Sequence, residues 1–219
     1  MIAQGPVQIS QVVRNAVLFN AKHWRVRPMN TDALPDAISR LFTLLDQRQV
    51  DYVLVGGIAL LSYVEGRNTD DIDLIVAVSA LAKLPEMAIT SQDMYFARGQ
   101  FQGLQIDFLL TSNPLFEQIR RRHTTAQRFD EREITTATVE GLLLLKLYAL
   151  PSLYREGNFA RVGLYENDVA TLLYYYQPDQ EAILSELAGH LSASDLAEVR
   201  GILAEIIQRI QRFGDNDRA

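Results

Sequence analysis

The pattern of hydrophobic and polar residues predicts short strands in the first half of the chain. Residues 52–57 ("YVLVGG") form an apolar run that ends in two glycines, as a buried strand followed by a turn does. Residues 71–78 ("DIDLIVAV") and 104–111 ("LQIDFLLT") predict two further strands, and 58–66 ("IALLSYVEG") predicts a helix that leaves the first turn.

Helical periodicity precedes and follows these strands. Residues 9–20 and 36–49 predict two helices near the N-terminus. After Pro114 the pattern becomes helical throughout, with apolar residues three and four apart in the last helix. The expected helices are 114–122, 138–150, about 164–176, 179–190 and 194–213. The expected fold class is therefore α/β (α+β), with a helical C-terminal region.

Composition narrows the classes of protein that the chain can represent. Its 219 residues, 48% hydrophobic and 22% charged, suffice for one large domain or two small ones. The absence of cysteine excludes disulfides, thiolate zinc sites and a cysteine nucleophile, and favours a cytoplasmic protein. The densest apolar run, Leu142–Leu150, contains Lys146 and is too short to cross a bilayer, so we expect no membrane association.

The charge is distributed unevenly along the chain. The formal net charge of −6 argues against general DNA binding. Residues 1–30 nevertheless carry four basic residues and no acidic one: Arg14, Lys22, Arg25 and Arg27. This arm either contacts a polyanion or is an ordinary solvated helix face.

Three aspartates carry the chemistry that the pattern suggests. Asp71 and Asp73 are separated by a single residue on a predicted strand, so their side chains share a face. Asp107 stands between apolar neighbours on the next predicted strand, where its charge needs a compensating partner. Such an oxygen cluster suits one or two hard divalent cations. Gly56 and Gly57 would let the backbone approach a phosphate beside it.

These residues together resemble a known family. Gly56-Gly57, then Arg67-x-Thr69-x-Asp71-x-Asp73-Leu74, then Ile106-Asp107 are similar to the signature of the DNA polymerase β-type nucleotidyltransferases. Lys146-x-x-Ala149, Arg155 and Asp168-Val169-x-x-Leu172-Leu173 resemble the helical half of the AbiEii-like abortive-infection toxin branch. The resemblance covers residues 36–176 and implies a polymerase-β-like mixed sheet.

The resemblance implies a role for each matching residue. Asp71, Asp73 and Asp107 would bind Mg²⁺, with Mn²⁺ as an alternative, and Asp107 would help to activate the attacking hydroxyl. The remaining implied residues bind nucleotide or organise the site: Gly56, Gly57, Arg67, Thr69, Lys146 and Asp168. Lys146 would reach the triphosphate, and Asp168 would orient Lys146 or Arg155. The family commonly has serine where this chain has Ile58.

Structural readings of the same residues stay open. The Asp-x-Asp pair can be turn chemistry, and Lys146 can extend from a core helix. Arg67 can pair with a neighbouring acid, and Asp168 can be an N-terminal helix charge. The arginines between residues 120 and 132 are either a solvated face or a groove for RNA or nucleotide: Arg120, Arg121, Arg122, Arg128 and Arg132.

Taken together, the sequence predicts three regions and one reaction. Residues 1–35 form an N-terminal helical arm, 36–125 the nucleotidyltransferase core and 126–219 the helical C-terminal region. The reaction is metal-dependent transfer of a nucleotide from a nucleoside triphosphate to an acceptor hydroxyl, with release of pyrophosphate. The resemblance implies a toxin that acts on tRNA or other RNA and is paired with an antitoxin protein. The alternatives are an antibiotic-type small-molecule nucleotidyltransferase and a catalytically inactive interaction module of the same fold.

Overall fold

The computed structural model describes residues 8, 9, 12, 34–64, 69, 71–129 and 132–214. The predicted helix over 9–20 lies mostly outside the described residues, and Arg67 lies outside them entirely. The chain divides into two compact units, residues 1–138 and 139–219, and each is described here by itself.

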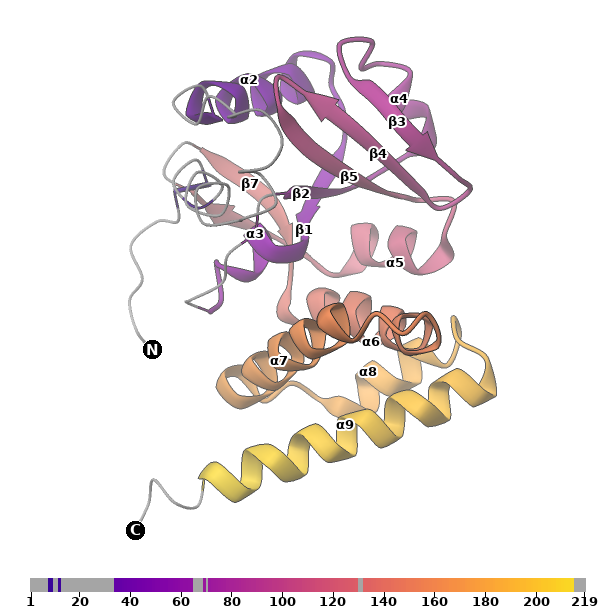
Figure 1. Ribbon diagram of the computed structural model, residues 1–219. Helices are drawn as coiled ribbons and strands as arrows, with labels where there is room; N and C mark the ends of the chain where they lie inside the picture. The colour runs from indigo at the N-terminus through magenta and orange to yellow at the C-terminus, as the bar shows by residue number, and fades with distance from the viewer. Residues whose placement is uncertain are drawn as a thin grey trace. The chain divides into compact units, whose positions relative to one another are not determined.

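The first unit is built on one mixed sheet of seven strands in the order β3-β4-β5-β2-β1-β7-β6 (Figure 1). The strands are β1 Tyr52–Val55, β2 Asp71–Val76, β3 Ala88–Gln92, β4 Phe96–Phe101, β5 Leu104–Leu110, β6 Thr124–Arg128 and β7 Glu133–Ala137. The pairs β2–β5 and β1–β7 are parallel, and the remaining neighbours are antiparallel. The expected fold class and the three predicted strands are confirmed.

Helices cover both faces of this sheet. Between residues 34 and 129, the described helices of the first unit are α2 Leu34–Gln47, α3 Gly56–Leu60, α4 Val78–Leu81 and α5 Pro114–Arg122. Phe42 of α2 packs on Tyr52 with a ring separation of 5.9 Å, and Phe116 of α5 packs on Phe96 at 5.4 Å. Register and alternation put Tyr52 and Phe96 on opposite faces, so α2 and α5 enclose the central strands (Figure 1).

The helix predicted over 58–66 needs correction. It begins earlier, at Gly56, and ends at Leu60. Beyond it the backbone tightens, because the N–H groups of Leu61 and Ser62 bond to carbonyls only three residues back, at 3.2 and 3.1 Å. The rest of the predicted helix that the structure describes is a turn over residues 61–63.

The described part of the second unit, residues 139–214, contains four helices: α6 Val139–Arg155, α7 Phe159–Tyr176, α8 Gln180–Leu187 and α9 Ala193–Gly214. All four were predicted. Helix α6 continues through Pro151 to Arg155 rather than stopping at 150, and α7 starts early because the Asn158 side chain caps the N–H of Arg161. On α9, Val199, Leu203 and Ile206 are buried, which confirms the apolar seam. Among the described helices of either unit, none has the length and apolar content that a bilayer crossing requires.

Candidate active site

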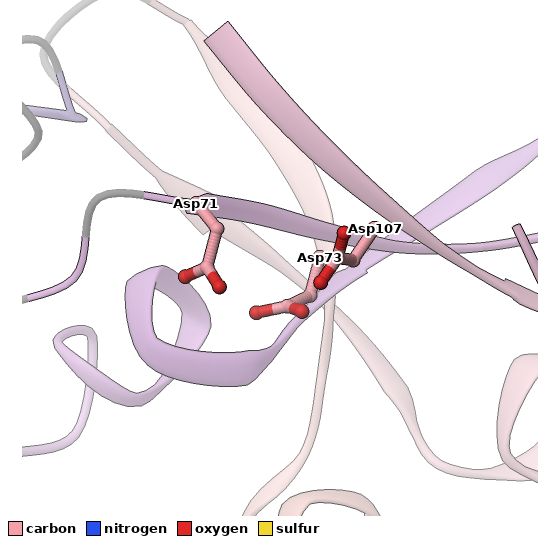
Figure 2. Close-up of side chains that lie close together, drawn as sticks. All are labelled: Asp71, Asp73 and Asp107. Atoms are coloured by element: carbon pink, nitrogen blue, oxygen red, sulfur yellow. The ribbon is translucent and has the colours of Figure 1, made fainter. Parts of the chain in front are cut away.

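The three aspartates converge on adjacent strands at the centre of the sheet. Asp71 and Asp73 lie on β2, and Asp107 lies on β5 directly opposite Asp73 in the parallel register. One carboxylate oxygen of each residue can be chosen so that all three lie within 4.8 Å of one another. Figure 2 shows Asp71 and Asp73 leaving β2 on the same side, with Asp107 beside Asp73.

The burial pattern of β2 explains why the carboxylates are accessible. Ile72 and Leu74 are fully buried, whereas Asp71 and Asp73 are only half-buried. The strand therefore presents one apolar face to the core and one acidic face to the site. Asp107 is half-buried as well, on a strand with the same alternation.

Gly56 is required by the close approach of the first strand to this cluster. Its φ of +67° is left-handed, and a Cβ built there would lie 1.8 Å from Oδ2 of Asp73. Val55, the residue before it, pairs with Asp73 in the antiparallel register. The backbone turn at Gly56 is thus pressed against the second aspartate.

Gly57 meets the next residue of the site in the same way. A Cβ at Gly57 would lie 2.7 Å from both Cβ and Oγ1 of Thr69. The Thr69 hydroxyl, 7% exposed as a residue, donates a 2.7 Å hydrogen bond to Oδ1 of Asp71. The two glycines and Thr69 therefore pack against the aspartates, and their role toward a nucleotide stays a prediction.

Arg98 is the residue of this cluster that sequence reasoning missed. It lies on β4 opposite Asp107 and donates two hydrogen bonds to it, from Nε to Oδ1 and from an Nη to Oδ2, both 2.7 Å. Hydrogen bonding to Asp107 raises the pKa of the Arg98 guanidinium, partial burial opposes the rise, and the charges of the nearby aspartates add to it. Arg98 is the compensating partner that Asp107 was expected to need.

Lys146 and Asp168 form a pair inside the second unit. Nζ of Lys146 donates a 2.6 Å hydrogen bond to Oδ2 of Asp168, and the two side chains are 6% and 2% exposed. The same ammonium lies 4.4 Å from the centre of the Tyr165 ring. Of the two partners considered for Asp168, the structure shows Lys146, while Arg155 forms an ion pair with Asp195. The role of Lys146 and Asp168 toward a nucleotide stays a prediction.

Some of the arginines between residues 120 and 132 form ion pairs with nearby acidic side chains. Arg120 binds Glu117 and Asp51, and Arg132 binds Asp46 at 2.7 Å. Arg121, Arg122 and Arg128 are exposed. Arg121 also lies 3.9 Å from Oε1 of Glu117, so the alternative of a basic groove rests mainly on Arg122 and Arg128.

Ile58, the position where the resemblance has serine, belongs to the core. It is fully buried on α3. Side-chain binding of phosphate at this position is accordingly replaced by apolar packing.

The residues of the acidic cluster fit a hard divalent cation. The donor set is made entirely of carboxylate oxygens, the ligands that Mg²⁺ and Mn²⁺ prefer. The absence of a side chain at Gly56 leaves room for the carboxylate of Asp73, which a Cβ there would meet at 1.8 Å. Asp71, Asp73 and Asp107 are thus the residues that would hold the metal.

The comparisons with known proteins give structural similarities at low sequence identity. No protein-family model matches the sequence, and no curated protein matches it. An antigenic nucleotidyltransferase-like protein from Paracoccidioides brasiliensis is similar at 15% identity and a TM-score of 0.49, over 89% of this chain and 94% of that chain. The antibiotic-resistance factor ANT(2'')-Ia in solution is similar at 12% identity and 0.48, over 84% and 96%.

A further structure, ANT(2'')-Ia in complex with adenylyl-2''-tobramycin, is similar at 12% identity and a TM-score of 0.49, over 78% of this chain and 95% of that chain. These names describe a nucleotidyltransferase-like protein and an antibiotic-resistance factor, and none of them refers to an abortive-infection toxin. The acidic cluster, rather than these similarities, carries the function proposed below.

The close approach at Gly56 makes a testable prediction. We expect Gly56→Ala to destabilise the protein by about 1–3 kcal/mol through its left-handed backbone, with a further loss from the collision with Asp73. Urea unfolding measures the effect. The matched control is Gly163→Ala on α7, where a Cβ meets nothing within 4 Å and should stabilise the helix by up to about 1 kcal/mol. Wild-type stability of Gly56→Ala would contradict the described contact.

Proposed function

We propose that the protein is a metal-dependent nucleotidyltransferase. It transfers the nucleotidyl group of a nucleoside triphosphate to an acceptor hydroxyl and releases pyrophosphate. The single observation that carries this proposal is the convergence of Asp71, Asp73 and Asp107 within 4.8 Å, beside the Gly56–Gly57 turn. Three carboxylates this close carry more negative charge than Arg98 alone compensates, so the arrangement is suited to metal binding.

The reaction follows from the groups at the cluster. Asp71 and Asp73 would hold the metal, with Thr69 fixing one oxygen of Asp71. When bound, divalent ions neutralise the charge that develops on the phosphoryl oxygens. Asp107 takes the proton of the acceptor hydroxyl, and the hydroxyl oxygen bonds to the α-phosphorus. At the same time the bond from that phosphorus to the pyrophosphate oxygen breaks.

The proposed nucleotide-binding residues extend beyond the acids. Gly56 and Gly57 begin α3 and pack directly against the side chains of Asp73 and Thr69, and we include their backbone N–H groups in the proposed triphosphate site. Arg67 and Thr69 would organise the turn before β2. We include Lys146 and Asp168 in this proposed set because they form a buried charged pair, a kind of group that is often retained for function.

The acceptor is the finer part of the proposal. Exposed Arg121, Arg122 and Arg128 favour a tRNA or another RNA acceptor, bound through its phosphates. The proposal that the protein is a toxin held in check by an antitoxin protein rests on the sequence resemblance alone. The ion pairs of Arg120 and Arg132 favour the alternative, a small-molecule acceptor of the antibiotic type.

Label transfer tests the reaction and the acceptor together. The purified protein is incubated with each of the four α-labelled nucleoside triphosphates and Mg²⁺, in one arm with total RNA and in another with aminoglycosides. We expect labelled product and pyrophosphate in one arm, with loss of both when EDTA removes the metal. A tRNA-sized labelled band supports the RNA acceptor, and a labelled aminoglycoside supports the small-molecule acceptor.

Two controls make the result interpretable. The Arg121→Glu/Arg122→Glu variant should weaken transfer to RNA but leave triphosphate binding intact, since phosphate contacts only position the acceptor. Triphosphate binding without Mg²⁺, at the same affinity as with it, would contradict the proposed metal site. Binding of triphosphate with metal but no transfer in either arm would favour the inactive interaction module.

A further inference from the structure

Arg98 forms an ion pair with Asp107, the third carboxylate of the proposed metal site. Its Nε and one Nη bind the two oxygens of Asp107 at 2.7 Å each, so the guanidinium engages both potential ligand atoms. Gln105 adds a weaker contact of 3.5 Å to Oδ1 of the same residue. The negative charges of Asp71 and Asp73 also stabilise the positive charge of the Arg98 guanidinium.

A guanidinium in this position competes with a divalent ion. The ion needs an oxygen of Asp107 together with oxygens of Asp71 and Asp73, which lie within 4.8 Å of it. The Arg98 guanidinium binds Asp107 from the side of β4, so it repels an incoming metal ion. It also uses the carboxylate lone pairs of Asp107 that the metal ion needs. Asp107 therefore has two alternative partners, one carried by the chain and one supplied from solution.

The exposures of the two side chains show which of them can move. The side chain of Arg98 is 48% exposed, and that of Asp107 is 16% exposed. An exposed ion pair is held only weakly, because water solvates a released guanidinium well. The buried Lys146–Asp168 pair, at 6% and 2%, has no such freedom. Release of Asp107 would therefore need only the Arg98 side chain to move into solvent.

We propose that Arg98 is a displaceable counter-ion of the acidic cluster, which holds Asp107 in the metal-free protein and releases it when a divalent ion binds. This rests on the proposed function, because it assumes that the cluster binds metal. Arg98 is a positioning residue in this role: it keeps Asp107 oriented and its charge compensated until the metal takes over. Metal binding then also frees a guanidinium at the edge of the site.

The experiment follows the Arg98 guanidinium directly. In ¹⁵N-labelled protein titrated with Mg²⁺ alone, the Nε–H resonance of Arg98, assigned by its loss in Arg98→Lys, should move toward the position of a solvated arginine. Its exchange with water should accelerate, since the hydrogen bond to Asp107 is broken. In parallel, calorimetry should show that Arg98→Lys binds Mg²⁺ about fivefold more tightly than wild type, equivalent to about 1 kcal/mol. Lysine keeps the positive charge but cannot donate the two parallel hydrogen bonds that Arg98 makes to Asp107.

The matched control is Arg48→Lys, since Arg48 is an arginine of similar exposure whose ion-pair partner is Glu86. It should leave the Mg²⁺ affinity unchanged. An Arg98 resonance that stays in place at saturating Mg²⁺, with binding that still depends on Asp73, overturns the displacement and leaves the metal site standing. No Mg²⁺ binding by wild type or by Arg98→Lys overturns both the inference and the proposed metal dependence.

Discussion

Asp73→Asn is expected to lower nucleotidyl transfer by on the order of 10³, because the substitution removes a charged metal ligand that contributes several kcal/mol of transition-state stabilisation. Asparagine has nearly the same size, so packing against Gly56 is kept. The melting temperature should stay nearly unchanged or rise slightly, since one of three neighbouring negative charges is lost. Label transfer measures the first effect and thermal unfolding the second.

The control for Asp73→Asn is Asp36→Asn, the same chemical change at an exposed position in the first turn of α2. It should leave transfer at the wild-type level. Calorimetric titration with Mn²⁺ adds a readout that needs no acceptor: Asp73→Asn should bind the ion much more weakly than either wild type or the control. Full transfer by Asp73→Asn would remove the acidic cluster from the mechanism. A large drop in melting temperature would instead make Asp73 a structural partner of the β1–β2 pair.

The strands that could be predicted from sequence are the ones buried at the centre of the sheet. β1, β2 and β5 have continuous or alternating apolar residues because helices cover both of their faces. β3 is exposed at every residue from Ala88 to Gln92, and β6 is mostly polar. Strands at the edges of a sheet carry little hydrophobic signal, so β3, β6 and their hairpin partners β4 and β7 were missed.

The shared face of Asp71 and Asp73 could be predicted from local sequence, whereas the pairing of Arg98 with Asp107 could not. Two residues apart on one strand, Asp71 and Asp73 must share a face whatever the rest of the fold does. The partner of Asp107 depends instead on the antiparallel register of β4 against β5. The alternation in "FARGQF", residues 96–101, with buried and exposed positions in turn, is the signal that could have placed Arg98 on a strand.

The pairing of Asp168 shows the same limit in the helical unit. The resemblance allowed either Lys146 or Arg155 as its partner, and the structure places both residues on α6. Only the packing of α6 against α7 decides that Lys146 reaches Asp168, while Arg155, in the last turn of α6, pairs with Asp195 of α9. Ion-pair partners that depend on how one helix is rotated against another cannot be predicted from hydrophobic periodicity alone.

Lys146→Met is expected to destabilise the protein by about 3–5 kcal/mol, because it leaves the buried carboxylate of Asp168 without its cation. The substitution keeps the length and apolar stem of the side chain, so the loss reports the charge rather than a cavity. Urea unfolding measures it. Lys83→Met, at an exposed lysine of the first unit, is the control and should change stability by no more than about 0.5 kcal/mol.

The double variant Lys146→Met/Asp168→Val separates the structural role of this pair from its proposed role toward nucleotide. Replacing both charges with apolar groups removes the uncompensated carboxylate, so most of the stability lost in Lys146→Met should return. A folded double variant that no longer binds a nonhydrolysable nucleoside triphosphate in the presence of Mg²⁺ would support Lys146 and Asp168 as nucleotide-binding residues. Wild-type triphosphate affinity in the same variant would make the pair purely structural. Equal destabilisation of the single and double variants would show that Lys146 stabilises the helices mainly through its contact with Tyr165, because that contact is lost in both.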